Sequence, residues 1–409
     1  GGVAGCHAAI SAAKRGVRVA VVDKGAVIRS GSGGAGVDHW HGAFTNPCSK
    51  ISPDEAMDIV KTFGPYSYGE FGNGIGCYIQ CKESYDALMD LETMGVKVRD
   101  VDDEFVGADF RDERTKLMFA YDYDNRYCIR VNGGADIKVA LYREMQRLGV
   151  RIFDRIMATL LLTEDGMQGG RVIGAAGVHT RTGEFYIFRS KAVILSMAVP
   201  AGQWIFSTEM IGFGSSFNDP NNTGDGTAMA WNAGAELALM ERSGRALSSG
   251  FFRYPPYGTG DCNNTWFACT IVDSNGKEIP WVDRDGRVLK NVTDRYRPAS
   301  GQKFFNYGRM GPYDIWGPTL IPDLSDRIKK GEFVLPLYAD LPGMPEHERR
   351  AIWGLMIYNE GKCRIIYDTY NRAGFDPEKD MLQLAVLPPE QYGRGPNWET
   401  YGPGQWREV

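Results

Sequence analysis

The sequence predicts an α/β protein built around a Rossmann-like nucleotide-binding domain, and three observations carry this prediction. A glycine-rich turn at residues 1–5 leads directly into a helical pattern. A β-branched run follows and ends at an acidic residue, Asp23. Further along, short strand patterns lead to an apolar run at 191–196 that is typical of a buried parallel strand. Strands that alternate with helices favour a parallel sheet with helices on its faces.

The N-terminal turn indicates where a dinucleotide would bind. A G-x-G-x-x-G turn lacking its first glycine would place these residues there: Gly1, Gly2 and Gly5. Glycine lets the backbone approach a pyrophosphate, and the following helix, expected over 3–15, presents N–H groups to the anion. Asp23 ends the strand expected over 17–22, about where dinucleotide folds place the carboxylate that binds ribose hydroxyls. An ordinary glycine-rich turn is the alternative, but the order of turn, helix, strand and acid favours the nucleotide site.

A second glycine-rich loop, from Arg29 to Gly36, narrows the choice of cofactor. It is too bare of side chains to form core. In a nicotinamide enzyme a helix normally follows the second strand, whereas a loop folded over a large flat ligand suits FAD. We therefore expect FAD contacts from Asp23 and from the residues after it, namely Lys24, Ser30, Gly31, Ser32, Gly33, Gly34 and Gly36.

At this loop the chain resembles the fumarate reductase and succinate dehydrogenase flavoprotein family, in which an acid-Lys-x-x-x-x-Arg-Ser segment leads to the flavin ring. Several members carry a histidine two residues after the arginine, bonded covalently to the flavin, and here that position is Gly31. The resemblance therefore implies non-covalent FAD, as in the related adenylylsulfate reductase α subunits. It also implies an interrupted FAD-binding domain with an inserted α+β capping domain.

Composition agrees with a soluble enzyme. The 409 residues are 43% hydrophobic and 24% charged with a formal charge of -5, which supports a full core and gives no nucleic-acid footprint. No apolar stretch reaches the roughly 18 residues of a membrane span. The eight cysteines form no C-x-x-C pair, so we expect no iron–sulfur or metal site in this chain. Cys77 and Cys81 fall one helical turn apart, and reduced thiols in a cytoplasmic protein are the simpler interpretation.

The next segments have recognisable helix signals. Ser52 begins a helix with a capping box completed by Glu55. A second helix is expected over 77–94, whereas the charged and aromatic residues 100–125 are expected to form a long surface excursion. A helix over 135–148 then leads to a strand at 150–153, which continues the α/β alternation.

An antiparallel meander follows, with strands expected over 157–162, 171–180 and 184–189 and a buried return strand over 191–196. Strand, meander and return strand form the interrupted dinucleotide fold of the same flavoproteins. Their return strand usually ends in Ala-Thr-Gly-Gly, and the Ser-Met-Ala-Val of this chain indicates another backbone path. In the first strand of the meander, Ala158 is a further expected FAD contact.

The residues 222–241 carry the second strong resemblance, to the family's T-G-D-G helix start and Met-Glu strand. Glycines there admit a ligand to the backbone, and the helix that follows points N–H groups at an anion. Thr223, Gly224 and Asp225 are therefore expected FAD contacts, and Asp225 matches the aspartate that the family uses on FAD. A plain helix N-cap is the alternative for Asp225.

The substrate residues are harder to assign, because the Phe-His-Pro-Thr and proton-donor Arg-Gly motifs of fumarate reductases are missing. An anionic substrate needs fixed positive charge, so Arg245 and Arg253 are the catalytic candidates. His41 is a candidate acid–base group, and His39 and Trp266 are candidate substrate contacts. The alternatives are surface arginines, core histidines and a core tryptophan.

The C-terminal part, from Pro280, is rich in Pro, Gly, Tyr and Trp, with helices expected over 345–358 and from Asp376. We expect a FAD-binding domain over 1–245, lacking its first strand, and a capping or substrate domain over 246–409. The C-terminal FAD return and helical domain are expected to be absent, so the chain is expected to be a fragment at both ends.

Together these features predict a FAD-dependent oxidoreductase of the fumarate reductase flavoprotein class. It would transfer two electrons between flavin and a small anionic substrate and exchange electrons with an iron–sulfur partner. One alternative is adenylylsulfate reductase α-like chemistry, in which flavin reacts with sulfur. The other is a flavin electron-transfer subunit without a substrate of its own.

Overall fold

The computed structural model describes residues 1–34, 36–57, 74–198, 223–237, 269–305, 318–359 and 361–383. The chain divides into two compact units, which are treated separately below. Among the described residues, the first unit contains those up to Gly36 and those from Asp136 to 237, and the second contains the rest. Residues 37–135, which precede the predicted boundary at 245/246, therefore pack with the second unit. The assignment of 1–245 to FAD binding and of 246–409 to a cap stays a prediction.

The first unit begins with helix α1, Val3–Lys14, and strand β1, Ala20–Val22. Gly16 ends the helical segment in the left-handed conformation, with φ +78°. Strand β1 pairs in parallel with β5, Arg151–Phe153, so that Val21 lies opposite Ile152. The two strands are short, and the helices that precede them lie together.

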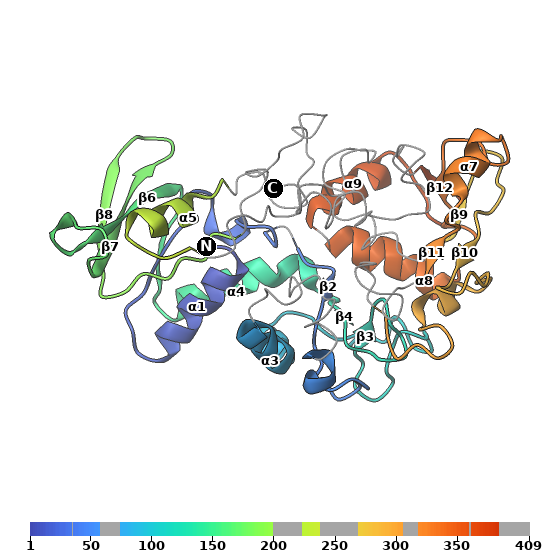
Figure 1. The fold of residues 1–409 in the computed structure, drawn as a ribbon, viewed down its shortest axis with the longest axis horizontal. Helices are drawn as coiled ribbons and strands as arrows, with labels where there is room; N and C mark the ends of the chain where they lie inside the picture. The colour runs from blue at the N-terminus through green and yellow to red at the C-terminus, as the bar shows by residue number, and fades with distance from the viewer. Residues whose placement is uncertain are drawn as a thin grey trace. The chain divides into compact units, whose positions relative to one another are not determined.

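Helix α4, Ile137–Arg147, packs against α1 and leads into β5 (Figure 1). A single 3-10 turn, Gly134–Asp136, precedes α4, and a second 3-10 turn, Val27–Arg29, follows β1. The predicted order of helix, strand, helix and strand is thus confirmed, with strand ends shifted by up to three residues.

The predicted meander is also confirmed. Strands β6, Ile156–Thr163, and β7, Val172–His179, pair antiparallel, and β7 pairs antiparallel with β8, Phe185–Arg189. A 3-10 turn at Glu164–Gly166 joins the first two strands. Helix α5, Asp225–Asn232, packs on β6 (Figure 1). The α5 helix starts where the T-G-D-G pattern predicts it.

The predicted buried strand at 191–196 is wrong. These residues form no strand, and Ile194 and Leu195 are 69% and 37% exposed. A strand needs a neighbour to pair its N–H and C=O groups, and none of the described strands pairs with this run. Its apolar composition alone therefore does not make it part of a sheet.

In the second unit, strands β2, His39–Trp40, and β3, Met118–Phe119, flank β4, Ile129–Arg130, in an antiparallel sheet. Helix α3, Gly74–Thr93, confirms the predicted helix at 77–94. Before it, the N–H of Ser52 donates to Glu55 and the N–H of Glu55 donates to Ser52 Oγ, as a capping box requires.

The prediction that 100–125 forms a surface excursion is wrong. Phe105, Phe110 and the residues 117–121 are buried in the core of the second unit. The charges in this segment are paired inside it: the buried Arg111 donates to Asp100 at 2.8 Å. Local pairing lets a charged sequence enter a core, which the composition of the segment does not show.

Short strands and helices make up the rest of the second unit. Strand β12, Tyr338–Ala339, pairs with β9, Ile271–Val272, and β13, Leu382–Gln383, while β10, Trp281–Val282, pairs with β11, Thr319–Leu320. The single 3-10 turn Val292–Tyr296 and helix α7, Leu324–Lys329, lie between these strands in the sequence.

Helix α8, Glu346–Arg350, continues into a π-helix, Ala351–Ile357, which confirms the predicted helix at 345–358. A further helix, α9, Gly361–Arg372, was not expected from the sequence. The helix predicted from Asp376 is wrong, because residues 376–379 form a turn in which Asp376 Oδ1 accepts from the N–H of Glu378. An aspartate followed by proline begins turns as readily as helices.

A buried polar cluster lies within this core. The Arg130 guanidinium donates to the Tyr123 hydroxyl, which donates to Glu348, each over 2.9 Å. The rings of Tyr123 and Tyr296 stack at 4.4 Å. The cluster gives the buried arginine both hydrogen-bond and aromatic partners. Among the described residues, no helix is long and apolar enough to cross a membrane.

Candidate functional site

The two glycine-rich segments of the first unit meet backbone to backbone. Gly2 immediately precedes α1, and no side chain caps this end of the helix. A Cβ atom at Gly31 would lie 2.9 Å from Cα of Gly2, and Gly31 has φ +82°. Only glycine therefore suits position 31 as the chain is placed. The turn and the second loop form the bare backbone cradle that the sequence predicts.

Asp23 lies beside the turn. Its Oδ2 is 3.2 Å from the Gly1 nitrogen, and its Oδ1 accepts a hydrogen bond of 2.7 Å from the N–H of Gly25. A Cβ atom at Gly1 would lie 2.3 Å from Asp23 Oδ2. The acid thus contacts the first glycine of the turn directly, as a carboxylate positioned for a bound ribose would.

Lys24, Thr223 and Asp225 form one cluster. The Lys24 ammonium lies 3.3 Å from both Thr223 Oγ1 and Asp225 Oδ2, and the Thr223 hydroxyl donates to Asp225 Oδ2 at 2.7 Å. The hydrogen bond from Thr223, assisted by the Lys24 charge, holds the pKa of Asp225 below its usual range. Gly224, in the left-handed conformation with φ +82°, occupies the N-cap position, so Asp225 is not the cap.

Glycine also permits close passage at two helix starts. A Cβ atom at Gly5 would lie 2.6 Å from Ser196 Oγ, and one at Gly226 would lie 2.7 Å from Met197 Sδ. The segment that replaces Ala-Thr-Gly-Gly therefore passes closely by the first turns of α1 and α5. It contains Ala198 with φ +57°, a conformation that glycine adopts freely.

The other predicted cofactor residues lie in the same unit. Gly34 closes the second loop by donating its N–H to Gly31 O at 2.8 Å. Ala158 lies in β6 opposite Gly177, and β6 begins beside the acid, because the Ile156 N–H donates to Asp23 O at 2.8 Å. Ser32, Gly33 and Gly36 lie within or next to the second loop. That any of these residues contacts FAD stays a prediction.

The sequence reasoning missed Lys138 and Cys6. The Lys138 ammonium is buried and donates to Gly1 O and to Cys6 Sγ. The available signal was helical spacing, since Lys138 shares the inner face of its predicted helix with Leu141 and Met145, both fully buried.

The two histidine candidates belong to the second unit. His39 Nδ1 lies 2.6 Å from Asp38 Oδ1 and 3.3 Å from the Tyr121 hydroxyl. The ring of His41 packs edge-on against Tyr127, and burial, assisted by His39, lowers the pKa of His41 to about 3. An imidazole with that pKa stays neutral at physiological pH, which disfavours the predicted acid–base role of His41. Arg245, Arg253 and Trp266 lie outside the described residues.

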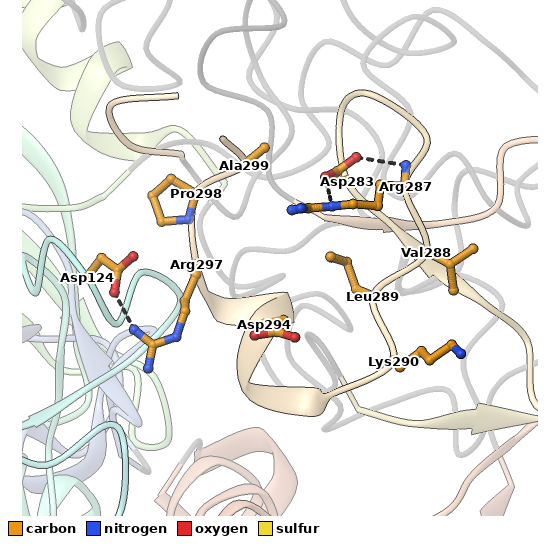
Figure 2. A pocket seen from close by; sticks show the side chains of 10 residues that line it. All are labelled: Asp124, Asp283, Arg287, Val288, Leu289, Lys290, Asp294, Arg297, Pro298 and Ala299. Carbon is orange, nitrogen blue, oxygen red and sulfur yellow. Dashed lines mark hydrogen bonds and ion pairs between the residues drawn. The ribbon is translucent and has the colours of Figure 1, made fainter. Parts of the chain in front are cut away.

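A cavity of about 430 Å³ lies in the second unit, away in sequence from every predicted site residue (Figure 2). Arg297 and Asp124 pair on one side of it, and Arg287 donates to Asp283 on the other. Its arginines are therefore engaged by carboxylates. We assign it no function. Among the described residues, no group of three or more His, Cys, Asp or Glu side chains is arranged to hold a metal ion.

Residues 1–243 match the model of a family described as the FAD binding domain. The chain belongs to this family of FAD-binding flavoproteins. FAD is the family's cofactor, and the matched range includes both glycine-rich segments, Asp23 and the Lys24–Asp225 cluster. The match also confirms the resemblance to fumarate reductase flavoproteins, because a relative with that name covers much of the same range.

The relative belongs to the fumarate reductase (CoM/CoB) of Methanothermobacter marburgensis, of which it is one subunit. It is 29% identical over 245 residues, which are 59% of this chain and 40% of the relative. A solved adenosine-5-phosphosulfate reductase in complex with sulfite is similar with a TM-score of 0.56 at 18% identity, over 93% of this chain and 55% of that chain. The quinol fumarate reductase of E. coli is similar with a TM-score of 0.52 at 16% identity, over 94% and 58%. The chain thus spans less than two thirds of each, and the structural likeness shows a shared fold.

Proposed function

We propose that this chain is the flavin-carrying part of a FAD-dependent oxidoreductase of the fumarate reductase flavoprotein class. The observation that carries the proposal is the family match over the segments that form the glycine cradle and the Lys24–Asp225 cluster. FAD, when bound, supplies a ring that accepts or donates two electrons. The residues of the chain bind and orient it.

Each part of the candidate site has a defined task in this proposal. The Gly2 N–H and the uncapped first turn of α1 would donate to the pyrophosphate. The carboxylate of Asp23 would accept from ribose hydroxyls. Lys24, Thr223 and Asp225 would hold the start of α5 toward the cofactor.

We further propose that FAD is held non-covalently. A flavin-linking histidine would have to stand at Gly31, where a Cβ atom would clash with Gly2 and where φ is +82°. Acid precipitation of the purified protein tests this: yellow colour in the supernatant supports a non-covalent flavin, and yellow colour retained in the pellet contradicts it.

The substrate is proposed to be a small anion, with Arg245 and Arg253 as the residues that bind it and the remainder of the second unit as its cap. An iron–sulfur subunit is the proposed electron partner, because the named relative is one subunit of a larger enzyme. Anaerobic bleaching or reoxidation of the flavin with fumarate, succinate, or adenylylsulfate plus sulfite selects the substrate.

Adenylylsulfate reductase-like chemistry is the second candidate, favoured by the missing proton-donor Arg-Gly motif of fumarate reductases. A flavin electron-transfer subunit without its own substrate is the third. Replacing Arg245 and Arg253 separates this last candidate from the others. A catalytic subunit loses turnover while its flavin is still reduced by dithionite, whereas an electron carrier keeps both properties.

A further inference from the structure

Three side chains from separate segments converge on one carbonyl oxygen, that of Gly1. The Ser30 hydroxyl donates to it at 3.0 Å and the Cys6 thiol at 3.3 Å. The Lys138 ammonium also donates to it, and this ammonium contacts Cys6 Sγ at 3.2 Å. A carbonyl with three donors around it is held in a single orientation.

Lys138 is an unusual residue for this position. It is only 1% exposed, and it lies on the face of α4 that also carries Leu141 and Met145. None of the ion pairs formed among the described residues includes its ammonium. A buried ammonium without a carboxylate partner is costly, so its retention beside the turn indicates an anion nearby when the site is filled.

The Gly1 carbonyl is informative because it shares a peptide unit with the Gly2 N–H. In a trans peptide the C=O and N–H bonds point in opposite directions. Donors fixed on Gly1 O therefore also fix the direction of the Gly2 N–H. That N–H belongs to the residue at which the chain enters α1.

We propose that Lys138 is a positioning residue for the pyrophosphate of FAD. Together with Ser30, it orients the Gly1–Gly2 peptide so that the Gly2 N–H points at the phosphates, and its charge stabilises them through that peptide. Ser30, expected from the sequence to contact the cofactor, thus acts through Gly1. The inference rests on FAD as the cofactor and adds a residue that neither glycine pattern contains.

The test compares three ligands on purified apo-protein by calorimetry: FAD, ADP and adenosine. FAD and ADP carry the diphosphate, and adenosine does not. In Lys138→Met the Kd of FAD and of ADP should rise about 10-fold or more, as for the loss of a charge-assisted hydrogen bond, while that of adenosine changes less than about 2-fold. Lys14→Met, at an exposed lysine of α1, should change none of the three.

Equal weakening of adenosine and ADP would show a merely structural role and overturn the proposal, as would an unchanged Kd for all three ligands. If Lys138→Met does not fold by circular dichroism, Ser30→Ala decides, because it removes a second donor from the same carbonyl. It should weaken ADP more than adenosine, and equal effects would overturn the proposal. A wild-type protein that binds no FAD would instead contradict the cofactor itself.

Discussion

The ammonium of Lys24 lies 3.3 Å from Oδ2 of Asp225, although 201 positions separate the two residues in the sequence. The contact ties the end of β1 to the start of α5 and brings two of the strongest sequence motifs together. Both side chains are partly exposed, so the pair contributes little to stability on its own. Its geometric effect is to hold the two predicted cofactor segments next to each other.

Asp225→Asn tests this pair through its pH dependence. The folded pKa of Asp225 lies below the ordinary value near 3.8, so the carboxylate stabilises the fold above that pH and loses this contribution as pH falls through the folded pKa. The free energy of unfolding of the variant should be lower by about 0.2–1 kcal/mol at pH 7 and should approach the wild-type value below about pH 3. Urea unfolding at both pH values measures the difference, and a gap that widens toward low pH would contradict the assignment.

Gly31→Ala should abolish FAD binding, and Gly16→Ala should not. Both glycines have positive φ, +82° and +78°, so each alanine introduces a similar backbone strain of about 1–2 kcal/mol. Only at Gly31 would the new Cβ meet another backbone atom, Cα of Gly2 at 2.9 Å, whereas nothing lies within 4 Å at Gly16. Flavin absorbance of the purified variants reads the result, and equal flavin content in the two variants would argue against the cradle.

Ala198→Gly should stabilise the protein. Ala198 has φ +57°, a conformation that costs an L-residue roughly 1–2 kcal/mol and costs glycine nothing, so a net gain of about 0.5–1 kcal/mol is expected after the entropy of the unfolded glycine is counted. Ala12→Gly, within helix α1, is the matched control and should destabilise by about 1 kcal/mol. Thermal unfolding of both variants distinguishes them. A lower melting temperature for Ala198→Gly would mean that the left-handed conformation is not the native one.

Local signals predicted much of the fold. The capping box at Ser52 and Glu55, the helix at 77–94 and the meander are set by neighbours in sequence, through side-chain caps, helical period and tight turns. The glycine cradle was predictable for the same reason, because the need for a bare backbone is written as glycine at fixed spacing.

Features that depend on distant partners were not predictable. The apolar run 191–196 has the composition of a buried strand, but composition does not tell whether a neighbouring strand is there to pair with it. The segment 100–125 was assigned to the surface because its charges were counted without their partners, such as Asp100 for Arg111. Lys138 was missed because its target is a carbonyl 137 residues away, which no sequence pattern records.

Asp122 and Asp273 are both buried, and they should give opposite pH dependences. Burial raises the pKa of Asp122 to about 7, despite hydrogen bonds from Asn125. Burial acts the same way on Asp273, but hydrogen bonds from the N–H groups of Lys277, Val334 and Asn275 outweigh it, and its pKa lies below the ordinary value. A raised carboxyl pKa means that the folded state binds the proton more tightly than the unfolded state, so stability falls as pH rises from about 4 to about 7.

Asp122→Asn should remove that fall, because the amide stays neutral at every pH. Within the window, each pH unit lowers the wild-type free energy of unfolding by up to about 1.4 kcal/mol through this one group. The variant should therefore gain stability relative to wild type between pH 5 and pH 7.5, whereas Asp273→Asn should lose stability by a similar amount at both pH values. Denaturant unfolding at these two pH values provides the comparison. A variant-to-wild-type difference at Asp122 that does not change with pH would show that this carboxyl titrates as it does in water.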